Sequence, residues 1–248
     1  MKLDVFLTPG ELAPADTTDR TVVILDVLRA SSTIVEALAS GARTIFPVSS
    51  IEEALRLANT IGREGVLLCG ERKCLPIEGF DLGNSPGDFT PERVGGKTLV
   101  MSTTNGTAAM TLAPGASRIL IASYLNLTAV VEELARTEAE PVFVCSGRDK
   151  HFGLEDAVCA GEIASRLVEA RPGEWQLNDG ARAAMSLARE FGPTVELFAG
   201  TAAGQAITAA GLSDDLAFCA QTDRHAVVPV LQERQITLAT PLHAVSER

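Results

Sequence analysis

One segment of the chain combines side chains that could bind an anionic ligand. Asp26 ends an apolar run, and Arg29, Ser31, Ser32 and Thr33 follow it. A carboxylate at the end of an apolar strand is costly unless it binds a cation or accepts hydrogen bonds. The hydroxyls and the free N–H groups of a starting helix would form an anion site, to which Arg29 adds a charge-assisted contact. The alternative is structural: the hydroxyls cap the helix and Asp26 pairs with Arg29.

A second hydroxyl-rich segment consists of Thr103, Thr104, Asn105, Gly106 and Thr107. Hydroxyls and a glycine at the start of a helix suit a phosphate or sulfonate group, because the backbone can approach such a ligand closely. The alternative is an Asn-Gly turn with a hydroxyl cap. The segment is therefore a second candidate anion site.

Acidic side chains in two further places are candidates for the same site. Glu155 and Asp156 are adjacent at the start of a predicted helix, where they could simply complement the helix dipole. Alternatively, one of them joins Asp26 around a hard divalent cation, since Mg²⁺ takes few carboxylates together with water and substrate phosphate. Glu71 belongs to a long irregular segment, residues 70–91, which is either functional or a solvated surface excursion.

The elements that must position these residues alternate along the chain. Strands are expected at residues 3–7, 21–27, 44–48, 66–69, 98–102, 118–122, 142–145, 226–231 and 236–239. Helices are expected to begin at Ser32, Ser50, Asn105, Thr128, Leu154 and Asn178, with further helix at 193–210; capping-box spacing occurs at 33–36 and 50–53. This order predicts a single α/β domain over residues 1–248, three-layer α/β/α with a mostly parallel or mixed sheet.

Polar segments follow several of the predicted strands. In an open α/β sheet, ligands bind beyond the carboxyl ends of the strands. Residues 26–33, 70–73 and 103–107 each follow a strand, and Asn126 follows the strand at 118–122. If these strands are parallel, the sequence predicts one ligand pocket at their shared edge.

Composition excludes several classes of function. The chain has 248 residues, 21 basic and 32 acidic side chains and a net charge of −11, which argues against nucleic acid and anionic membranes as partners. We find no apolar run of roughly 18–20 residues and no signal peptide. The five cysteines are scattered, as expected for reduced thiols in the cytoplasm. The GxGxxG, P-loop and GxSxG motifs are absent.

Four motifs in order resemble those of the 2-phosphosulfolactate phosphatase family: residues 26–33, 78–86, 103–107 and 155–156. The resemblance extends over nearly the whole chain. It implies a fold peculiar to that family. It also implies a Mg²⁺-dependent phosphatase that hydrolyses 2-phospho-3-sulfolactate to 3-sulfolactate and phosphate, a step toward coenzyme M.

The resemblance leads to a mechanistic hypothesis. Asp26, with Glu71, Glu155 or Asp156, would hold Mg²⁺, and Arg29 with the amides at 31–33 would bind phosphate oxygens. The turn at 103–107 would hold phosphate or the sulfonate. Asp26 could be a metal ligand, a nucleophile or a base. The alternatives are a phosphatase for another small phosphorylated 2-hydroxy acid and a non-catalytic anion-binding module. We expect a homodimer, because such dimers are the commonest assemblies.

Overall fold

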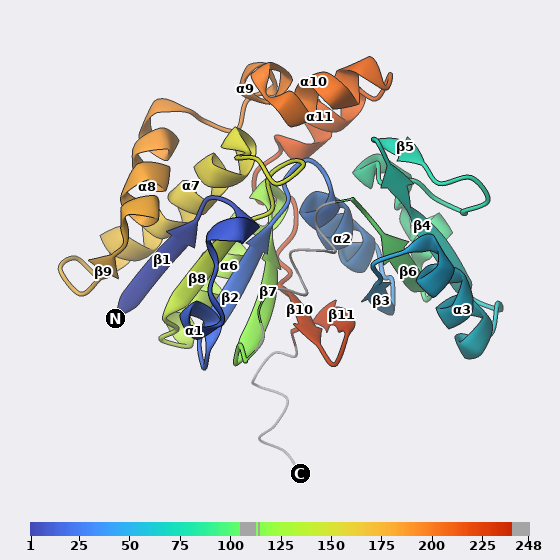
Figure 1. Ribbon diagram of the computed structural model, residues 1–248, viewed down its shortest axis with the longest axis horizontal. Coiled ribbons are helices and arrows are strands. Elements are labelled where there is room, and N and C mark those ends of the chain that lie inside the picture. Colours follow the sequence, from blue (N-terminus) through green and yellow to red (C-terminus); the bar gives the residue numbers. More distant parts are fainter. Residues whose placement is uncertain (105–112, 114, 240–248) are drawn as a thin grey trace, which may run out of the picture.

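The computed structural model describes residues 1–104, 113 and 115–239 (Figure 1). Asn105, Gly106 and Thr107, and the helix expected to begin at Asn105, lie outside the described residues. The strands are β1 (Lys2–Phe6), β2 (Thr21–Leu25), β3 (Thr44–Pro47), β4 (Val66–Arg72), β5 (Leu75–Pro76), β6 (Thr98–Ser102), β7 (Arg118–Ala122), β8 (Pro141–Cys145), β9 (Gln176–Leu177), β10 (Pro229–Gln232) and β11 (Gln235–Leu238).

Helices connect most of these strands. They are α1 (Pro14–Thr17), α2 (Ala30–Ala39), α3 (Ile51–Ile61), α4 (Pro91–Val94), α6 (Leu127–Arg136), α7 (Leu154–Ala170), α8 (Asp179–Glu190), α9 (Val195–Gly200), α10 (Ala202–Ala209) and α11 (Asp214–Cys219). The short 3-10 turns are η1 (Pro9–Glu11), η2 (Pro86–Asp88) and η3 (Tyr124–Asn126).

Of the two segments with capping-box spacing, residues 50–53 cap a helix and residues 33–36 do not. Ser50 precedes α3, and its hydroxyl accepts the backbone N–H of Glu53 at 3.1 Å. The prediction for 33–36 is wrong, because α2 begins earlier, at Ala30, and Thr33 therefore lies inside the first turn. The turn that carries Asp26 and the start of α2 are thus closer together than the sequence pattern indicated.

The sheet is mixed and has the order β5-β4-β6-β3-β11-β10-β7-β2-β8-β1-β9. One parallel set contains β4, β6 and β3, and the other contains β7, β2, β8, β1 and β9. The antiparallel β10–β11 hairpin joins the two sets. This arrangement confirms the expected α/β fold with a mostly parallel sheet and an antiparallel minority.

Helices cover both faces of the sheet, which confirms the three-layer prediction. Along β2, Val23 and Leu25 pack in the apolar cluster with α7 and α8, whereas Val22 and Ile24 pack in the cluster that contains α2. Such alternation is the period of a strand whose two faces are both buried.

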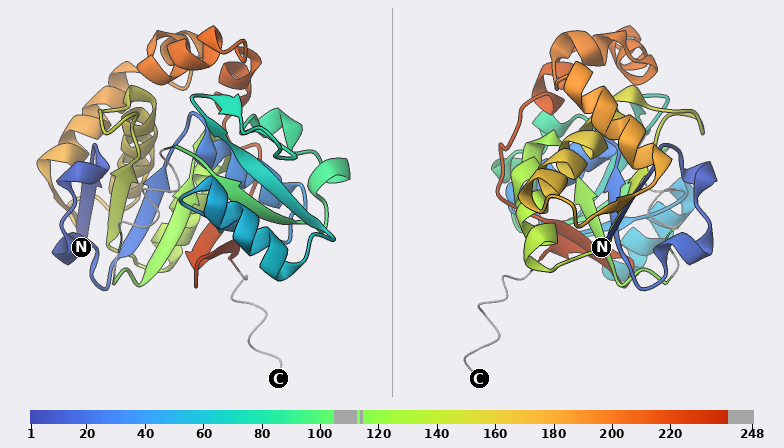
Figure 2. Two further views of the ribbon diagram at one scale, coloured as in Figure 1. Left: turned by 45° about the vertical axis from the view of Figure 1, so that its right-hand side comes forward. Right: turned by 90° about the vertical axis from the view of Figure 1, so that its left-hand side faces the viewer.

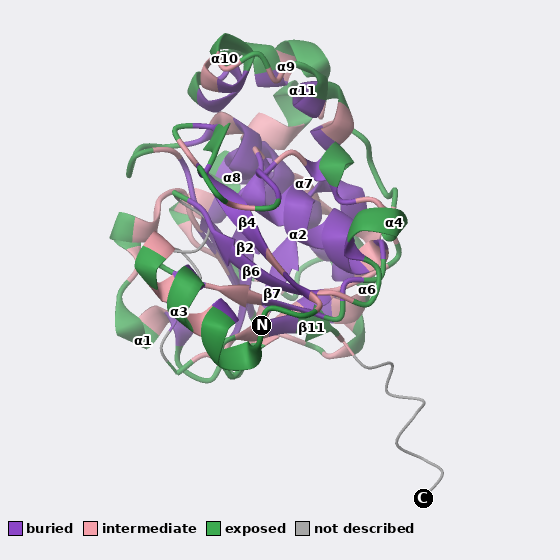
Figure 3. Cartoon of the chain, turned by 90° about the vertical axis from the view of Figure 1, so that its right-hand side faces the viewer, coloured by how far each residue is buried: buried purple, intermediate pink, exposed green. Residues whose placement is uncertain are grey.

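Helix α2 lies between the two parallel sets of strands (Figure 1). Its apolar residues share one cluster with residues of β2, β7 and β8 and also with residues of β3, β4 and β6. Residues 30–38 are all buried, as Figure 3 shows by colour. A helix buried on every side has to be surrounded, so the sheet bends around α2 and brings the ends of distant strands together.

Helices α9, α10 and α11 form a cap above one end of the sheet (Figure 2). The cap is tied together by short N-cap bonds, for example from the N–H of Gly204 to the hydroxyl of Thr201 at 3.0 Å. Within the described part of the chain, no helix has the length and apolar character needed to span a membrane.

Candidate active site

A pocket of about 550 Å³ lies where the turn after β2 meets β4, the β4–β5 turn and the segment after β6. The loop after β8 and helix α10 complete its wall. The predicted site residues that line it are Asp26, Arg29, Glu71, Thr103 and Thr104. The convergence expected from sequence is therefore present, although the strands that carry these residues belong to two sets rather than one.

Asp26 is the buried acid of this pocket, with a side chain held at the start of α2. Its Oδ1 accepts the backbone N–H of Ala30 at 3.2 Å, and its own N–H donates to the hydroxyl of Ser31 at 2.9 Å. Burial is the main reason why the pKa of Asp26 is raised to about 7. The Ala30 hydrogen bond and the Arg29 charge lower this pKa, whereas the negative charges of Glu71 and Glu155 raise it. A carboxylate in this setting favours a nearby cation.

Arg29 lines the same pocket and is almost fully buried. Its Nη1 donates to Asp215 Oδ2 at 2.6 Å and to the hydroxyl of Ser85 at 3.0 Å, while Nη2 donates to the carbonyl of Cys74 at 2.8 Å. The ion pair that the sequence offered as an alternative, Arg29 with Asp26, is replaced by one with Asp215. Ser85 belongs to the motif at 78–86, and neither it nor Asp215 was predicted as a site residue.

The hydroxyls of Ser31, Ser32 and Thr33 serve the turn rather than the pocket. All three residues are fully buried and do not line the cavity. The Ser32 hydroxyl donates to the carbonyl of Val27 at 2.9 Å, and the Thr33 hydroxyl donates to the carbonyl of Asn84 at 3.0 Å. This geometry does not support the predicted contact of these hydroxyls with substrate, because their hydrogen bonds are made to the protein.

Glu71 joins two loops at the pocket. Its Oε1 accepts the backbone N–H of Thr104 at 2.8 Å, and its Oε2 accepts that of Cys74 at 2.8 Å. One carboxylate therefore fixes both the β4–β5 turn and the segment after β6. Lone pairs of the same oxygens remain for a cation, since each oxygen can accept more than one bond.

Glu155 and Asp156 begin α7 beside the turn that carries Asp26. Asp156 accepts the backbone N–H of Val27 at 2.8 Å and that of Gly147 at 2.9 Å, so it ties this turn to the loop after β8. Burial raises the pKa of both carboxyls, and their mutual repulsion raises that of Asp156 further. Neither residue lines the pocket, although the charge of Glu155 raises the pKa of Asp26 and the charge of Asp26 raises that of Asp156.

These acids fit a divalent cation without forming a closed cage. Over residues 1–104 and 115–239, His, Cys, Asp and Glu side chains form no group of three or more arranged to hold a metal. Mg²⁺ requires only one or two protein carboxylates when water and substrate phosphate complete its shell. Glu155 Oε2 is buried without a hydrogen-bond partner in the described structure, and a buried anionic oxygen in that state is suited to a cation.

Cationic side chains line the other part of the pocket: Arg72, Lys73 and Arg148. Arg72 is held by the carbonyl and the hydroxyl of Ser102, at 3.2 and 2.9 Å. Lys73 is exposed in the β4–β5 turn, where its φ is 53°. The pocket thus has positive charge to bind an anion in a protein whose net charge is −11.

Asn126 is not part of the pocket. Its Oδ1 accepts the N–H of Ser123 at 3.0 Å, and its Nδ2 donates to the carbonyls of Ile121 and Val227. The residue is fully buried and connects the end of β7 to the segment before β10. Its predicted role in substrate binding has no geometric support. Asn84 and Ile207 line the pocket instead, and sequence reasoning assigned neither of them to it.

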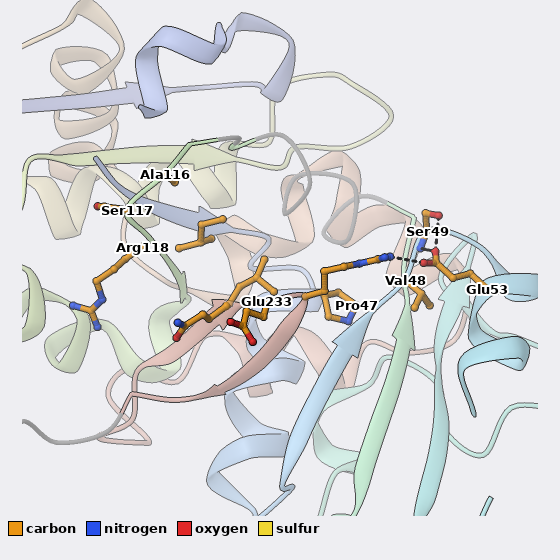
Figure 4. A pocket seen from close by; sticks show the side chains of 12 residues that line it. Pro47, Val48, Ser49, Glu53, Ala116, Ser117, Arg118 and Glu233 are labelled. Carbon is orange, nitrogen blue, oxygen red and sulfur yellow. Dashed lines mark hydrogen bonds and ion pairs between the residues drawn. The ribbon is translucent and has the colours of Figure 1, made fainter. Parts of the chain in front are cut away.

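A second hollow, of about 440 Å³, lies at the β10–β11 hairpin (Figure 4). Glu53 on its wall already accepts hydrogen bonds from the N–H and the hydroxyl of Ser49, and it pairs with Arg234 at 2.6 Å. Glu53 and Arg234 therefore neutralise each other in this wall, and Arg118 pairs with Glu133 outside it. The first pocket, where buried acids face cationic side chains, is the better candidate for chemistry.

The fold and this pocket define an α/β enzyme class that acts on small anions. The chain matches the family model described as 2-phosphosulpholactate phosphatase over residues 6–234, so it belongs to that family.

Similar curated proteins carry the name probable 2-phosphosulfolactate phosphatase. That of Symbiobacterium thermophilum is 43% identical over 221 residues, which is 88% of this chain and 94% of the relative. That of Carboxydothermus hydrogenoformans is 40% identical over 96% of this chain and 97% of the relative. That of Thermotoga maritima is 41% identical over 86% of this chain and 89% of the relative.

Proposed function

We propose that this protein is a phosphoric monoester hydrolase that converts 2-phospho-3-sulfolactate to 3-sulfolactate and phosphate. The observation that carries the proposal is the presence of buried Asp26 and buried Arg29 in one pocket of a chain from this family. A fixed guanidinium can stabilise charge on phosphoryl oxygens, and a carboxylate in the same pocket can bind a metal ion or act as a base or nucleophile. We also propose a cytoplasmic location and a homodimer, on the sequence grounds given above.

The residues around Asp26 support a Mg²⁺ cofactor. Asp26, with Glu71 and Glu155, would hold the ion, since their charges already act on one another across the site. When bound, Mg²⁺ would neutralise charge on the phosphoryl oxygens. Asp156 does not line the pocket, unlike Glu71, and both of its oxygens accept backbone N–H groups, unlike Oε2 of Glu155. We therefore assign it a supporting position beside the ligands.

The substrate has three anionic groups, and the pocket offers separate partners for them. Arg29 would donate hydrogen bonds to the phosphoryl oxygens, because it lines the same pocket as Asp26 and its charge acts on that residue. Arg72, Lys73 and Arg148 would attract the carboxylate and the sulfonate. Thr103 and Thr104 also line the pocket and would contact whichever oxygens lie nearest.

Release of inorganic phosphate tests the proposal. The purified protein is assayed with 2-phospho-3-sulfolactate, phospholactate and 3-phosphoglycerate, each with Mg²⁺ and with a chelator. We expect Mg²⁺-dependent release that is fastest with 2-phospho-3-sulfolactate. Faster release from another substrate would identify a different phosphorylated 2-hydroxy acid, and ligand-induced stabilisation without any release would indicate a binding module.

The variant Asp26→Asn sharpens this test, with Asp179→Asn as its matched control. Asp179 is an exposed aspartate at the start of α8, far from the pocket wall in sequence and not among its residues. Asp26→Asn should lose nearly all turnover and keep its circular dichroism spectrum, whereas the control should keep both. Wild-type turnover in Asp26→Asn would reject the assignment of Asp26.

A further inference from the structure

We propose that Asp215 of the cap is a positioning residue that orients the Arg29 guanidinium toward the substrate anion. The inference rests on the proposed function, because it concerns how the pocket binds a phosphoryl group. Asp215 is contributed by α11, far along the chain from the turn that carries Arg29.

The contact between the two residues is a buried, closely hydrogen-bonded ion pair. Nη1 of Arg29 lies 2.6 Å from Oδ2 of Asp215, and the two side chains are only 2% and 10% exposed. The hydroxyl of Ser85 donates to the same Oδ2 at 2.8 Å and accepts from Nη1 at 3.0 Å. Three groups from separate parts of the chain therefore fix one another, and the position of the guanidinium follows from that triangle.

The hydrogen bonds of Arg29 define which donors remain for a ligand. A guanidinium has five N–H donors. Two on Nη1 are used by Asp215 and Ser85, and one on Nη2 is used by the Cys74 carbonyl. Within the described residues, Nε–H and one Nη2–H have no acceptor. Two fixed donors of one guanidinium match two oxygens of a phosphoryl group, which is the bidentate geometry that favours arginine over lysine.

Asp215 also links the orientation of Arg29 to the cap. Ile207 of α10 lines the pocket, and α11 holds Arg29 from behind, so the same helical unit forms a wall and positions a binding group. Without the Asp215 carboxylate, the buried guanidinium would form hydrogen bonds with other acceptors. Asp26 and the bound substrate lie in the same pocket and are two such acceptors. The resulting change of orientation would weaken binding of the anion.

A double-mutant cycle tests this role on the full-length protein. We expect Asp215→Asn to lower kcat/KM for 2-phospho-3-sulfolactate by about 10- to 100-fold, the size of effect that misplacement of a binding group produces. In an Arg29→Met background the same substitution should have no further effect, because there is no guanidinium left to orient. Equal losses in both backgrounds would show a merely structural role and overturn the proposal.

A second measurement does not depend on turnover. Calorimetric titration with inorganic phosphate should show weaker binding to Asp215→Asn than to the wild type, by a factor of about ten, as for loss of one charge-assisted contact. Unchanged phosphate affinity would overturn the positioning role. If the wild-type protein binds phosphate but releases none from the substrate, the proposed function is contradicted. The phosphate affinities of the wild type and Asp215→Asn would still show whether Asp215 positions Arg29.

Two further variants complete the design. Asp214→Asn is the matched control, because Asp214 is the preceding residue, is exposed and does not line the pocket; it should behave as wild type. Ser85→Ala removes one member of the triangle without leaving a buried charge unpaired. It should reduce kcat/KM and phosphate affinity in the same direction as Asp215→Asn but to a smaller extent, even if Asp215→Asn folds poorly. Full wild-type behaviour of Ser85→Ala together with additive losses in the cycle would reject the proposal.

Discussion

The carboxylate of Glu71 accepts the backbone N–H of Thr104 at 2.8 Å, which joins β4 to the segment that follows β6. Its second oxygen is bound to the N–H of Cys74. Glu71 therefore shapes two walls of the pocket while it faces Asp26 electrostatically. Substitution of Glu71 should therefore change both metal binding and the positions of the two loops.

The variant Glu71→Gln tests whether Glu71 contributes to metal binding as well as to the shape of the pocket. The amide keeps the size of the side chain but removes its charge, and its single oxygen can accept only one of the two backbone N–H groups. We therefore expect lower stability, and a rise of about 10-fold or more in the Mg²⁺ concentration for half-maximal activity. A magnesium titration of phosphate release measures the change. Glu78→Gln, an exposed glutamate in the same segment, is the control. An unchanged magnesium requirement in Glu71→Gln would exclude it from the metal site.

Asp156→Asn should destabilise the protein. Both Asp156 oxygens accept backbone N–H groups, from Val27 and Gly147, and an amide can accept only one of these bonds. An unsatisfied buried N–H costs about 1–3 kcal/mol in the free energy of unfolding. Urea denaturation followed by circular dichroism measures this loss. If the variant unfolds at the same urea concentration as the wild type, the two bonds do not hold the turn.

The stability of the metal-free protein should fall as pH rises from about 4 to 7. The pKa of Asp26 is raised by burial from 3.8 to about 7 in the folded protein. In this window the folded state keeps a proton that the unfolded state has lost, so the free energy of unfolding decreases with rising pH, by an amount on the order of 4 kcal/mol at most.

Thermal denaturation in a chelator at several pH values measures this dependence, and Asp26→Asn should flatten it. Mg²⁺ should restore stability most strongly near and above pH 7, where the carboxylate is ionised. A melting temperature of the chelated wild type that increases steadily from pH 5 to 7.5 would contradict the assignment.

Gly70→Ala should be strongly destabilising. Gly70 lies in β4 at φ 146°, and a Cβ there would overlap the backbone carbonyl oxygen of Ser102. The neighbouring strand would have to shift, which we expect to cost about 2 kcal/mol or more. Gly200→Ala is a suitable comparison, since a Cβ at Gly200 meets open space. Equal melting temperatures for the two variants would show that β4 can adjust.

Much of the fold could be predicted from the sequence because β-branched runs and their spacing carry a strong signal. All nine expected strands are present, at most a few residues from their predicted bounds. The strands β5 and β9 have two residues each, which is too short for any periodicity. The antiparallel hairpin between two parallel sets could not be inferred either, since strand order depends on contacts between distant segments.

Part of the pocket could be predicted from the sequence, and the reason is physical. Asp26, Arg29 and Glu71 could be found because charged residues next to buried strands need partners. Ser31, Ser32 and Asn126 have the same polarity but bond to the backbone, and residue type alone does not separate these cases. Asp215 could not be assigned from sequence, because its role depends on the cap lying over the pocket.

The Arg29–Asp215 pair has a consequence for how the protein is made. The two residues are 186 positions apart, so a ribosome must have synthesised most of the chain before the guanidinium meets its counter-ion. Until then, α2 has neither the cap above it nor the β10–β11 hairpin beside it. The Arg29 guanidinium therefore reaches its final position only after most of the chain has been made, and C-terminal truncations that remove α11 should yield inactive protein.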